Sequence, residues 1–137
     1  MNKEIKTLIK DYATKRSFTY KAITEEQIKE AEESLSVKLP SQYLEFLKEY
    51  GQGGIGGIEV LGIGANNQLV FVEETLDYRQ YGLPQNLIVI ENCGEWVYCI
   101  DSDTCAIISW SQDLTKEEYP DFDSYLLDRF SDAAENL

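Results

Sequence analysis

Apolar residues recur at helical spacing in the part of the chain before Gly51. The clearest stripe occupies positions i, i+3, i+4 and i+7, with Tyr43, Phe46, Leu47 and Tyr50. Pro40 can open such a helix and Gly51 can close it. The pattern therefore predicts a short amphipathic helix that contributes one face to the core.

Two earlier segments and one late segment have the same period. The sequence Thr24-Glu25-Glu26-Gln27 forms a capping box, so we expect a helix to begin there and to end before Leu39-Pro40. The last helix begins near Pro120-Asp121. The apolar faces of the first, second and last helices are Ile5, Leu8, Ile9 and Tyr12; Ile28, Ala31 and Leu35; and Phe122, Tyr125, Leu126 and Phe130.

After Gly51 the apolar period changes from helical to strand-like. We expect the sheet to start with strands over 55–61 and 69–72, with a turn at Asn66-Asn67 between them. The mostly polar residues 73–81 predict a short helix. Three further strands are expected at 87–90, 96–100 and 105–110.

This order of helices first, strands next and one closing helix is typical of an α+β fold. We therefore expect a single domain, 1–137, with a mainly antiparallel sheet packed with the N-terminal helices and a closing C-terminal helix. The length of 137 residues, with 43% hydrophobic, is enough for one core without disulfides or metals.

The three cysteines, Cys93, Cys99 and Cys105, lie in or beside predicted strands, and no CxxC pair is present. We interpret them as buried thiols in a reducing compartment. A tight turn at 101–104 would pair Ile100 with Cys105. Alternation along the strands then places Cys99 and Cys105 on opposite faces, so they cannot form a disulfide with each other.

No apolar run reaches the ~18 to 20 residues of a membrane helix. The charged start Met1-Asn2-Lys3-Glu4 also lacks the apolar stretch of a secretory signal. We expect a cytoplasmic protein with no membrane partner.

The net charge of −13 arises from 12 basic and 25 acidic residues, which are unevenly placed. Residues 1–23 carry 6 basic and 2 acidic side chains, residues 24–50 carry 3 and 7, and residues 51–137 carry 3 and 16. The negative field therefore belongs to the second part of the chain. Such a field repels nucleic acid and speeds encounter with a basic partner, although acidity can also serve solubility alone.

Two motifs lack the context that their usual chemistry needs. The GxGxxG spacing of residues 51–56 requires a strand before it and a helix after it for a dinucleotide, and here the predicted order is reversed. Asp101-Ser102-Asp103 opens like a calcium loop, but the Gly and Glu required at the sixth and twelfth positions are missing. We interpret the two segments as a helix end and a hairpin turn.

The chain contains no histidine, which removes the usual catalytic triads and most zinc sites. Glu91 and Glu95 flank a turn and could approach each other as a glycosidase-like pair, but solvated strand-end charges are the favoured interpretation. We therefore expect no catalytic residue, no cofactor and no metal.

Three aromatic residues of the sheet region admit two interpretations. Trp96 and Tyr98 share one face of their strand, and Trp110 lies on the other face in the predicted pairing. Aromatic residues in strands are usually core residues, yet an aromatic inside an acidic rim is the composition of a binding hot spot. With so few basic residues nearby, stacking on nucleic-acid bases is not favoured.

Taken together, these motifs resemble the SUKH superfamily. The matching segments are an acidic helix over 25–35, the Leu-Pro-x-x-Tyr-x-x-Phe-Leu run from Leu39 to Leu47, a glycine-rich helix end over 50–57, Leu83-Pro84 before the strand 87–90, an aromatic strand followed by an acid over 96–101, and a closing helix over 122–130. The match covers the chain from about residue 24 to 130. It departs from the family at Tyr50-Gly51, where members often have Asn-Gly.

The resemblance implies an immunity protein, which is not an enzyme. Such a protein binds and neutralises a cognate toxin, commonly the basic C-terminal nuclease domain (RNase or DNase) of a protein encoded by a neighbouring gene. The superfamily also contains eukaryotic regulators of cell-wall synthesis, so a non-enzymatic regulatory or scaffold module that binds proteins is the alternative. A basic toxin would contact the acidic part of the chain; the candidate residues are Glu73, Glu74, Asp77, Glu91, Glu95, Trp96, Asp101 and Asp103.

Overall fold

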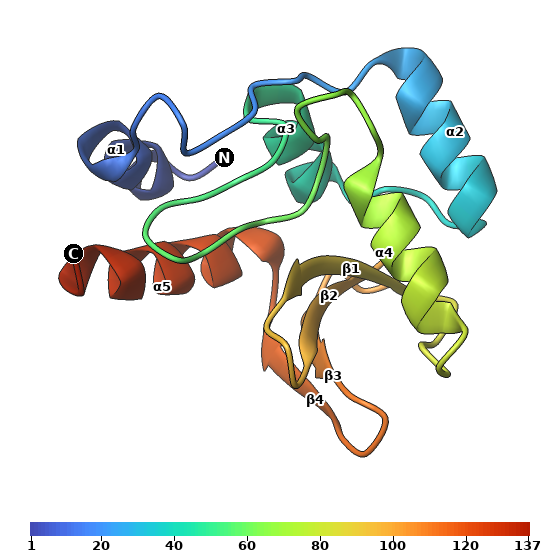
Figure 1. The fold of residues 1–137 in the computed structure, drawn as a ribbon. Coiled ribbons are helices and arrows are strands. Elements are labelled where there is room, and N and C mark those ends of the chain that lie inside the picture. The colour runs from blue at the N-terminus through green and yellow to red at the C-terminus, as the bar shows by residue number, and fades with distance from the viewer.

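Four strands follow one another as a meander and pair in the order β1-β2-β3-β4, with every pair antiparallel. The computed structural model describes residues 1–137. Five helices pack against this sheet and against one another (Figure 1). The predicted single-domain α+β class is confirmed. In chain order the elements are α1 (Lys3–Tyr12), α2 (Glu25–Leu35), α3 (Ser41–Glu49), α4 (Val70–Arg79), β1 (Leu87–Asn92), β2 (Val97–Asp101), β3 (Ile107–Trp110), β4 (Thr115–Tyr119) and α5 (Phe122–Glu135).

The four amphipathic helices predicted from the apolar period are all present. At the start of α2, the Thr24 hydroxyl accepts from the backbone N–H of Gln27 (3.1 Å), and the Gln27 side chain accepts from the backbone N–H of Thr24 (3.0 Å). The capping box is thus complete. α3 begins directly after Pro40, and Gly51 follows its end with φ of 76°. Its buried face is the one that the spacing predicts.

Tyr43 of α3 lies at the centre of the core. Its side chain is fully buried, and its ring contacts the rings of Phe71 and Phe122 edge to face. Its hydroxyl donates to the backbone carbonyl of Leu61 (2.6 Å). This one side chain therefore joins α3, α4 and α5. None of the five helices combines the length and the apolar character that a membrane crossing requires.

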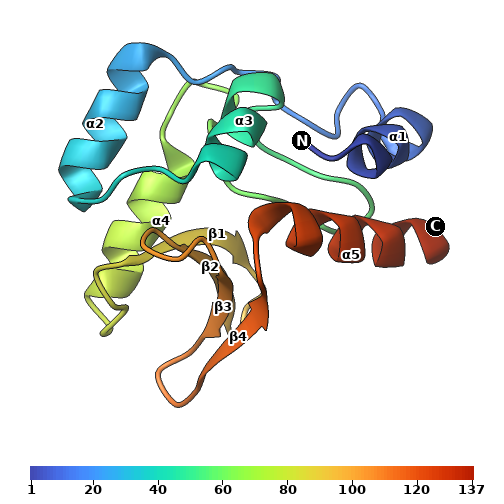
Figure 2. The same ribbon diagram turned by 180° about the vertical axis from the view of Figure 1, so that it is seen from behind.

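Helices pack on both faces of the sheet. α4 packs on one face, where the backbone N–H of Val89 donates to the Thr75 hydroxyl (2.9 Å) and the ring of Tyr78 meets that of Trp110 edge to face. α5 covers part of the other face through Tyr125. In both views α1 lies beside α5, and the β3–β4 hairpin projects away from the helices (Figure 1, Figure 2). Most of β4 is exposed as a result.

The glycine-rich segment after α3 holds the connection between α1 and α2. The backbone N–H of Gly54 donates to the carbonyl of Ser17 (3.0 Å), and that of Thr19 donates to the carbonyl of Gln52 (2.9 Å). A Cβ atom at Gly53 would lie 1.9 Å from the Ser17 carbonyl oxygen, and φ at this residue is +130°. Only glycine permits this approach, which gives the predicted helix-end segment a structural role.

Residues 55–61 and 69–72 do not form the strands that the pattern predicts. The first segment is irregular, with one isolated bridge between Gly53 and Val60, and the second begins α4. Both are rich in buried apolar residues, and a short apolar run does not distinguish a strand from a buried helix. The turn at Asn66-Asn67 is present, and the helix expected over 73–81 forms the later part of α4.

The sheet also differs from the prediction in register and extent. Ile100 pairs with Ile107 rather than with Cys105, because Cys105 adopts φ of 69° and belongs to the connection between β2 and β3. The register differs by two residues, so the side chains that share a face are those predicted. The apolar pattern does not predict β4, because its residues are charged or polar and almost wholly exposed.

Candidate protein-binding surface

An exposed tryptophan marks the end of the sheet where β1 turns into β2. Trp96 is 39% exposed, whereas Trp110 is buried (6%) and Tyr98 is half-buried. Trp110 pairs with Val97, which places its side chain on the face of α4, opposite to the face that Trp96 and Tyr98 share. Trp110 is therefore a core residue, whereas Trp96 is at the surface, where it could contact a partner.

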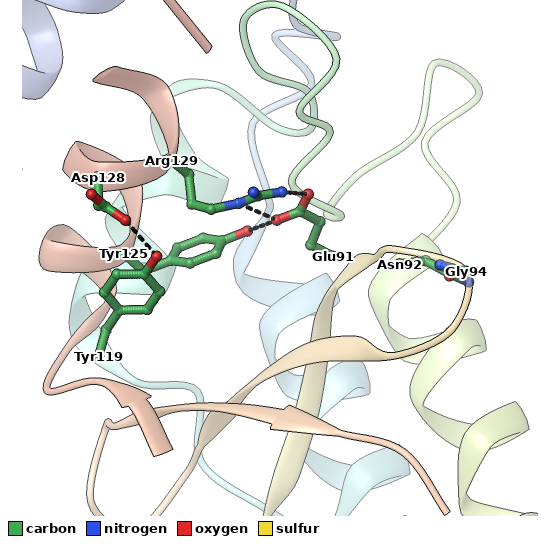
Figure 3. A network of polar contacts seen from close by, with 7 residues as sticks. All are labelled: Glu91, Asn92, Gly94, Tyr119, Tyr125, Asp128 and Arg129. Carbon is green, nitrogen blue, oxygen red and sulfur yellow. Dashed lines mark hydrogen bonds and ion pairs between the residues drawn. The ribbon is translucent and has the colours of Figure 1, made fainter. Parts of the chain in front are cut away.

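The turn before β2 fixes the backbone of Trp96. The backbone N–H of Cys93 donates to the carbonyl of Trp96 (3.0 Å). Gly94, at φ of 88°, donates its N–H to the side-chain oxygen of Asn92 (2.9 Å; Figure 3). The rings of Trp96 and Tyr98 meet edge to face, with centroids 6.3 Å apart. The indole is thus supported by the turn and by one neighbouring ring.

Two hollows flank Trp96. Their volumes are about 220 and 300 Å³, and they share Glu95, Trp96 and Ser111. We call this region the Trp96 surface and define it by Glu95, Trp96, Leu114 and Glu118. The smaller hollow is completed by Tyr78, Tyr81 and Trp110 and the larger one by Tyr98, Leu114 and Glu118, among other residues.

A largely buried ion pair joins α5 to β1 on the face of the sheet that carries Tyr98 (Figure 3). Arg129 donates from Nε to Oε1 of Glu91 (3.2 Å) and from Nη2 to Oε2, and the Tyr125 hydroxyl donates to Oε1 (2.6 Å). The guanidinium carbon of Arg129 also lies 5.1 Å from the centre of the Tyr98 ring. A continuous line of contacts therefore runs from Glu91 through Arg129 and Tyr98 to Trp96.

The phenols and the guanidinium around this ion pair keep their protons at neutral pH. Burial and the neighbouring Glu91 carboxylate raise the pKa of Tyr125 well above its usual value, so its phenol remains a donor. Burial alone would lower the pKa of Arg129, but the hydrogen bonds and charge of Glu91 give a net upward shift. Burial and a hydrogen bond to Asp128 raise the pKa of Tyr119 in the same way. Arg129 is therefore a cation among neutral phenols.

Glu91 is 4% exposed, so its interpretation as a solvated strand-end charge is wrong. The physical reason is a bulge in β1 between Val89 and Glu91. In a regular strand these two residues would share the face of α4, but the bulge turns Glu91 toward α5 and Arg129. Both carboxylate oxygens are used there, which leaves Glu95 as the exposed acid of this turn.

Two further predicted residues lie beside or within the Trp96 surface. Glu95 lines both hollows, and Glu74 of α4 accepts a hydrogen bond from the Asn92 side chain (3.1 Å) at the same turn. Glu73 and Asp77 are exposed on the same helix.

The other predicted acids lie at the far end of β2. Asp101 is the last residue of that strand, and its carboxylate accepts from the backbone N–H of Asp103 (2.8 Å) within the connection to β3. The expected hairpin turn is therefore present, in a longer form than predicted. The structure does not bring Asp101 and Asp103 together with Trp96, because a whole strand separates them.

Tyr81, Leu114 and Glu118 are among the exposed residues of the two hollows that were not predicted from the sequence. Tyr81 and Leu114 are 58% and 66% exposed. Leu114 is the one apolar residue in the polar run 111–118, and this isolation was the available signal for an exposed hairpin tip. Glu118 carries no such signal, because its place depends on β4.

The three basic side chains after residue 50 neutralise little of the negative charge at this surface. Arg129 is paired with Glu91, and Arg79 donates to the backbone carbonyl of Leu35 (2.8 Å). Lys116 of β4 is exposed and takes part in no ion pair. The exposed acids of the sheet half thus have one lysine among them.

All three cysteines are free, but Cys99 alone is fully buried. Cys93 is half-buried, and burial raises the pKa of its thiol to about 11. Cys105 is exposed, so the expectation of a buried thiol is wrong for this residue, which the longer β2–β3 connection places outside the sheet. No three carboxylate or thiol side chains converge as they would around a metal ion.

Known proteins resemble this chain in sequence and in fold. The family SUKH_5, described as SMI1-KNR4 cell-wall, matches residues 1–131, so the match includes α1, which lies outside the motif resemblance. A crystal structure of a protein from Pseudomonas syringae pv. tomato has a TM-score of 0.68 and 25% sequence identity to the chain. The similarity covers 86% of this chain and 88% of that chain.

Proposed function

The chain belongs to the SMI1-KNR4 cell-wall family SUKH_5, and on this premise we propose that it is an immunity protein that binds and neutralises a cognate toxin. The toxin is the basic nuclease domain, an RNase or a DNase, at the C-terminus of a protein encoded by a neighbouring gene. The immunity protein acts by occupying a surface of the toxin, and this role requires neither a catalytic residue nor a cofactor.

The observation that supports a basic partner is the placement of charge on the folded chain. The residues after position 50 carry 16 acids and 3 bases, and two of those bases, Arg79 and Arg129, are bonded within the protein. A negative field that its own chain does not neutralise attracts a positively charged surface and orients it during encounter.

A nuclease fits this field because its substrate groove must attract phosphate groups. Basic side chains in such a groove bind the phosphate backbone of nucleic acid. The positive potential of the groove attracts an acidic protein as it attracts the substrate. Once bound over the groove, this protein repels nucleic acid from the complex. Inhibition then follows from occupation and from electrostatic exclusion together.

The direct test is co-expression of the chain with the candidate toxin domain. We expect the chain to restore growth in cells that express the toxin of the neighbouring gene and to leave unrelated nuclease toxins active, because specificity needs matched shape as well as charge. Equal protection against unrelated nucleases would indicate a nonspecific polyanion. Binding of several partners without a linked toxin would favour the regulatory or scaffold alternative.

Charge-neutralising variants locate the contact. One set replaces Glu73, Glu74 and Asp77 on α4, a second replaces Glu95, and a third replaces Asp103 at the far end of β2, each by the matching amide. We expect the sets near Trp96 to slow association at low salt more than at high salt. Glu91 and Asp101 are excluded from the sets because their carboxylates hold the fold. Charge reversal at Lys3, Lys6 and Lys10 is the matched control, and it should leave binding intact.

A further inference from the structure

The five surface hollows of the protein differ in the charges that line them. Each of the three that lie away from Trp96 contains a basic residue, namely Lys29 and Lys38 in one, Lys3 in another and Arg16 in the third. The two that flank Trp96 contain acidic side chains and no basic one. An exposed aromatic ring, a concave shape and acids that form no ion pair therefore coincide at the Trp96 surface. Lys116, the neighbour of Ser109 on β4, lies on the same face of the sheet and pairs with neither Glu95 nor Glu118.

The larger hollow at this surface matches a single side chain better than a small molecule. Its volume of about 300 Å³ lies at the lower end of ligand pockets, which span roughly 300 to 1,000 Å³. Trp96 and Leu114 supply apolar walls, while Glu95 and Glu118 supply charge. The Ser109 hydroxyl donates to the Glu118 carboxylate (2.9 Å) and so restrains it in place.

The same face of the sheet already binds one arginine between an aromatic ring and a carboxylate. Arg129 lies 5.1 Å from the centre of the Tyr98 ring and pairs with Glu91, which is the cross-strand neighbour of Tyr98. Trp96 precedes Tyr98 by two residues on this face, and Glu118 contacts Ser109, the neighbour of Tyr98 on β3. The Trp96 surface thus repeats an aromatic ring beside a carboxylate at the solvent-exposed end of the sheet.

We infer that the Trp96 surface docks an arginine side chain of the protein partner. The guanidinium stacks on the indole of Trp96 and donates to the carboxylate of Glu118 or Glu95, and the aliphatic stem lies against Leu114. Arginine is preferred to lysine because a planar, delocalised cation can stack and form paired hydrogen bonds at once. The inference rests on the proposed function and names the contact by which the toxin is held.

A peptide titration tests this recognition without any toxin. The probe is acetyl-Gly-Arg-Gly-Arg-Gly amide, and the control is the same peptide with citrulline, which keeps the shape of arginine but lacks its charge. The readout is the indole N–H signal of Trp96 in a ¹⁵N–¹H spectrum, assigned by its loss in Trp96→Phe. We expect the chemical shift of this signal to change when the arginine peptide is added and to remain unchanged with the citrulline peptide. The Glu118→Gln variant should show a smaller change with the arginine peptide.

The acids around the α2 hollow provide an internal reference in the same spectra. Glu25, Glu32 and Glu33 line that hollow with two lysines and no aromatic ring. Their backbone signals should move less than the Trp96 signal. Equal movement at α2 and at Trp96, or no movement of the Trp96 indole while α2 responds, would show that the peptide senses charge alone and would overturn the inference.

The second arm of the test measures the affinity of the variants for the toxin domain. Trp96→Ala should raise the dissociation constant about 30-fold or more, as for the central residue of a binding hot spot, and Trp96→Phe should recover most of the loss. Tyr12→Ala removes an aromatic side chain of similar exposure (43%) on α1 and should have no effect. The spectra of each variant verify its folding.

The two arms separate failure of the inference from failure of the proposed function. If the toxin binds the wild-type protein and all Trp96 and Glu118 variants equally well, the docking contact is wrong and the immunity function stands. If no toxin of a neighbouring gene binds the wild-type protein, the proposed function is wrong. The peptide titration then decides by itself whether the surface recognises arginine.

Discussion

Arg129 reaches from α5 to Glu91 on β1 and forms the one ion pair of the protein in which both side chains are largely removed from solvent, with 21% and 6% of their surfaces exposed. The two residues are 38 positions apart, so the pair fastens the closing helix to the first strand. A charge held in this way becomes costly once its partner is removed, because the remaining ion stays buried without compensation.

We therefore expect Arg129→Met to destabilise the fold by ~3 to 5 kcal/mol. The double variant Glu91→Gln with Arg129→Met should cost less than Arg129→Met alone, since no buried carboxylate is left and the glutamine still accepts from Tyr125. Urea unfolding followed by circular dichroism measures both values. If the losses in the free energy of unfolding of the two single variants simply add in the double variant, the two side chains are not coupled. Lys6→Met, which breaks an exposed pair with Glu49, is the control and should change stability little.

Gly53→Ala should be among the most damaging small substitutions in the chain. The new Cβ atom would lie 1.9 Å from the carbonyl oxygen of Ser17, and the backbone at +130° is a region that only glycine occupies readily. The backbone strain alone costs ~1 to 3 kcal/mol, and the overlap adds to it. Gly57→Ala is the matched control, because nothing lies within 4 Å of its Cβ position. Similar thermal midpoints for the two variants would refute the close approach.

Asp121 gives a prediction about pH. Its carboxylate accepts from the backbone N–H of Ser124 (2.8 Å) at the start of α5, and this hydrogen bond lowers its pKa below the ordinary 3.8. Folding thus favours the ionised form, so the stabilisation is complete well above pH 3.8 and is lost as the pH falls through the folded-state pKa. Asp121→Ala should cost about 1 kcal/mol near pH 7.

The difference between Asp121→Ala and the wild type should shrink in acid. Asp121→Asn keeps a side-chain acceptor without a titrating charge, so it should retain most of the cap and lose the pH dependence. Unfolding curves between pH 2 and 7 provide the measurement. A gap between wild type and Asp121→Ala that stays constant over this range would show that the cap does not depend on ionisation.

The three cysteines should react with a thiol reagent in a fixed order at pH 8. Cys105 is exposed and should react first. Burial raises the pKa of Cys93 to about 11, so little thiolate is present and the reaction should be slower. Burial raises the pKa of Cys99 further, and this thiol should react only in denaturant. Cys105→Ser should remove the fast phase, and survival of that phase would reassign it to Cys93.

The helices of this fold could be predicted from the sequence because their apolar residues keep one period and their ends carry clear signals. Thr24 and Gln27 are the best example, since both hydrogen bonds of the capping box are present. The run 69–72 is predicted as a strand but begins a helix, because its apolar residues are consecutive and this helix has little amphipathic character. Such a run fits a buried strand equally well.

The candidate site was predictable only in part. Trp96 and Glu95 could be selected because an aromatic and an acid stand together beside a turn. Glu118 could not, because it lies on an edge strand that lacks apolar alternation. The role of Glu91 depended on a bulge and on Arg129 in a distant helix, and neither leaves a local signal in the sequence.

The meander of the sheet has a consequence for the order of folding. Each strand pairs with the next one along the chain, so the sheet can assemble by closing short loops, whereas the docking of α1 on α5 must bring together the two ends of the sequence. We expect pulsed hydrogen exchange during refolding to protect amides of β2 and β3 before those of α1, and the reverse order would contradict this. The acidic half of the molecule that contains the sheet would then acquire its shape first, while the basic N-terminal helix completes the structure.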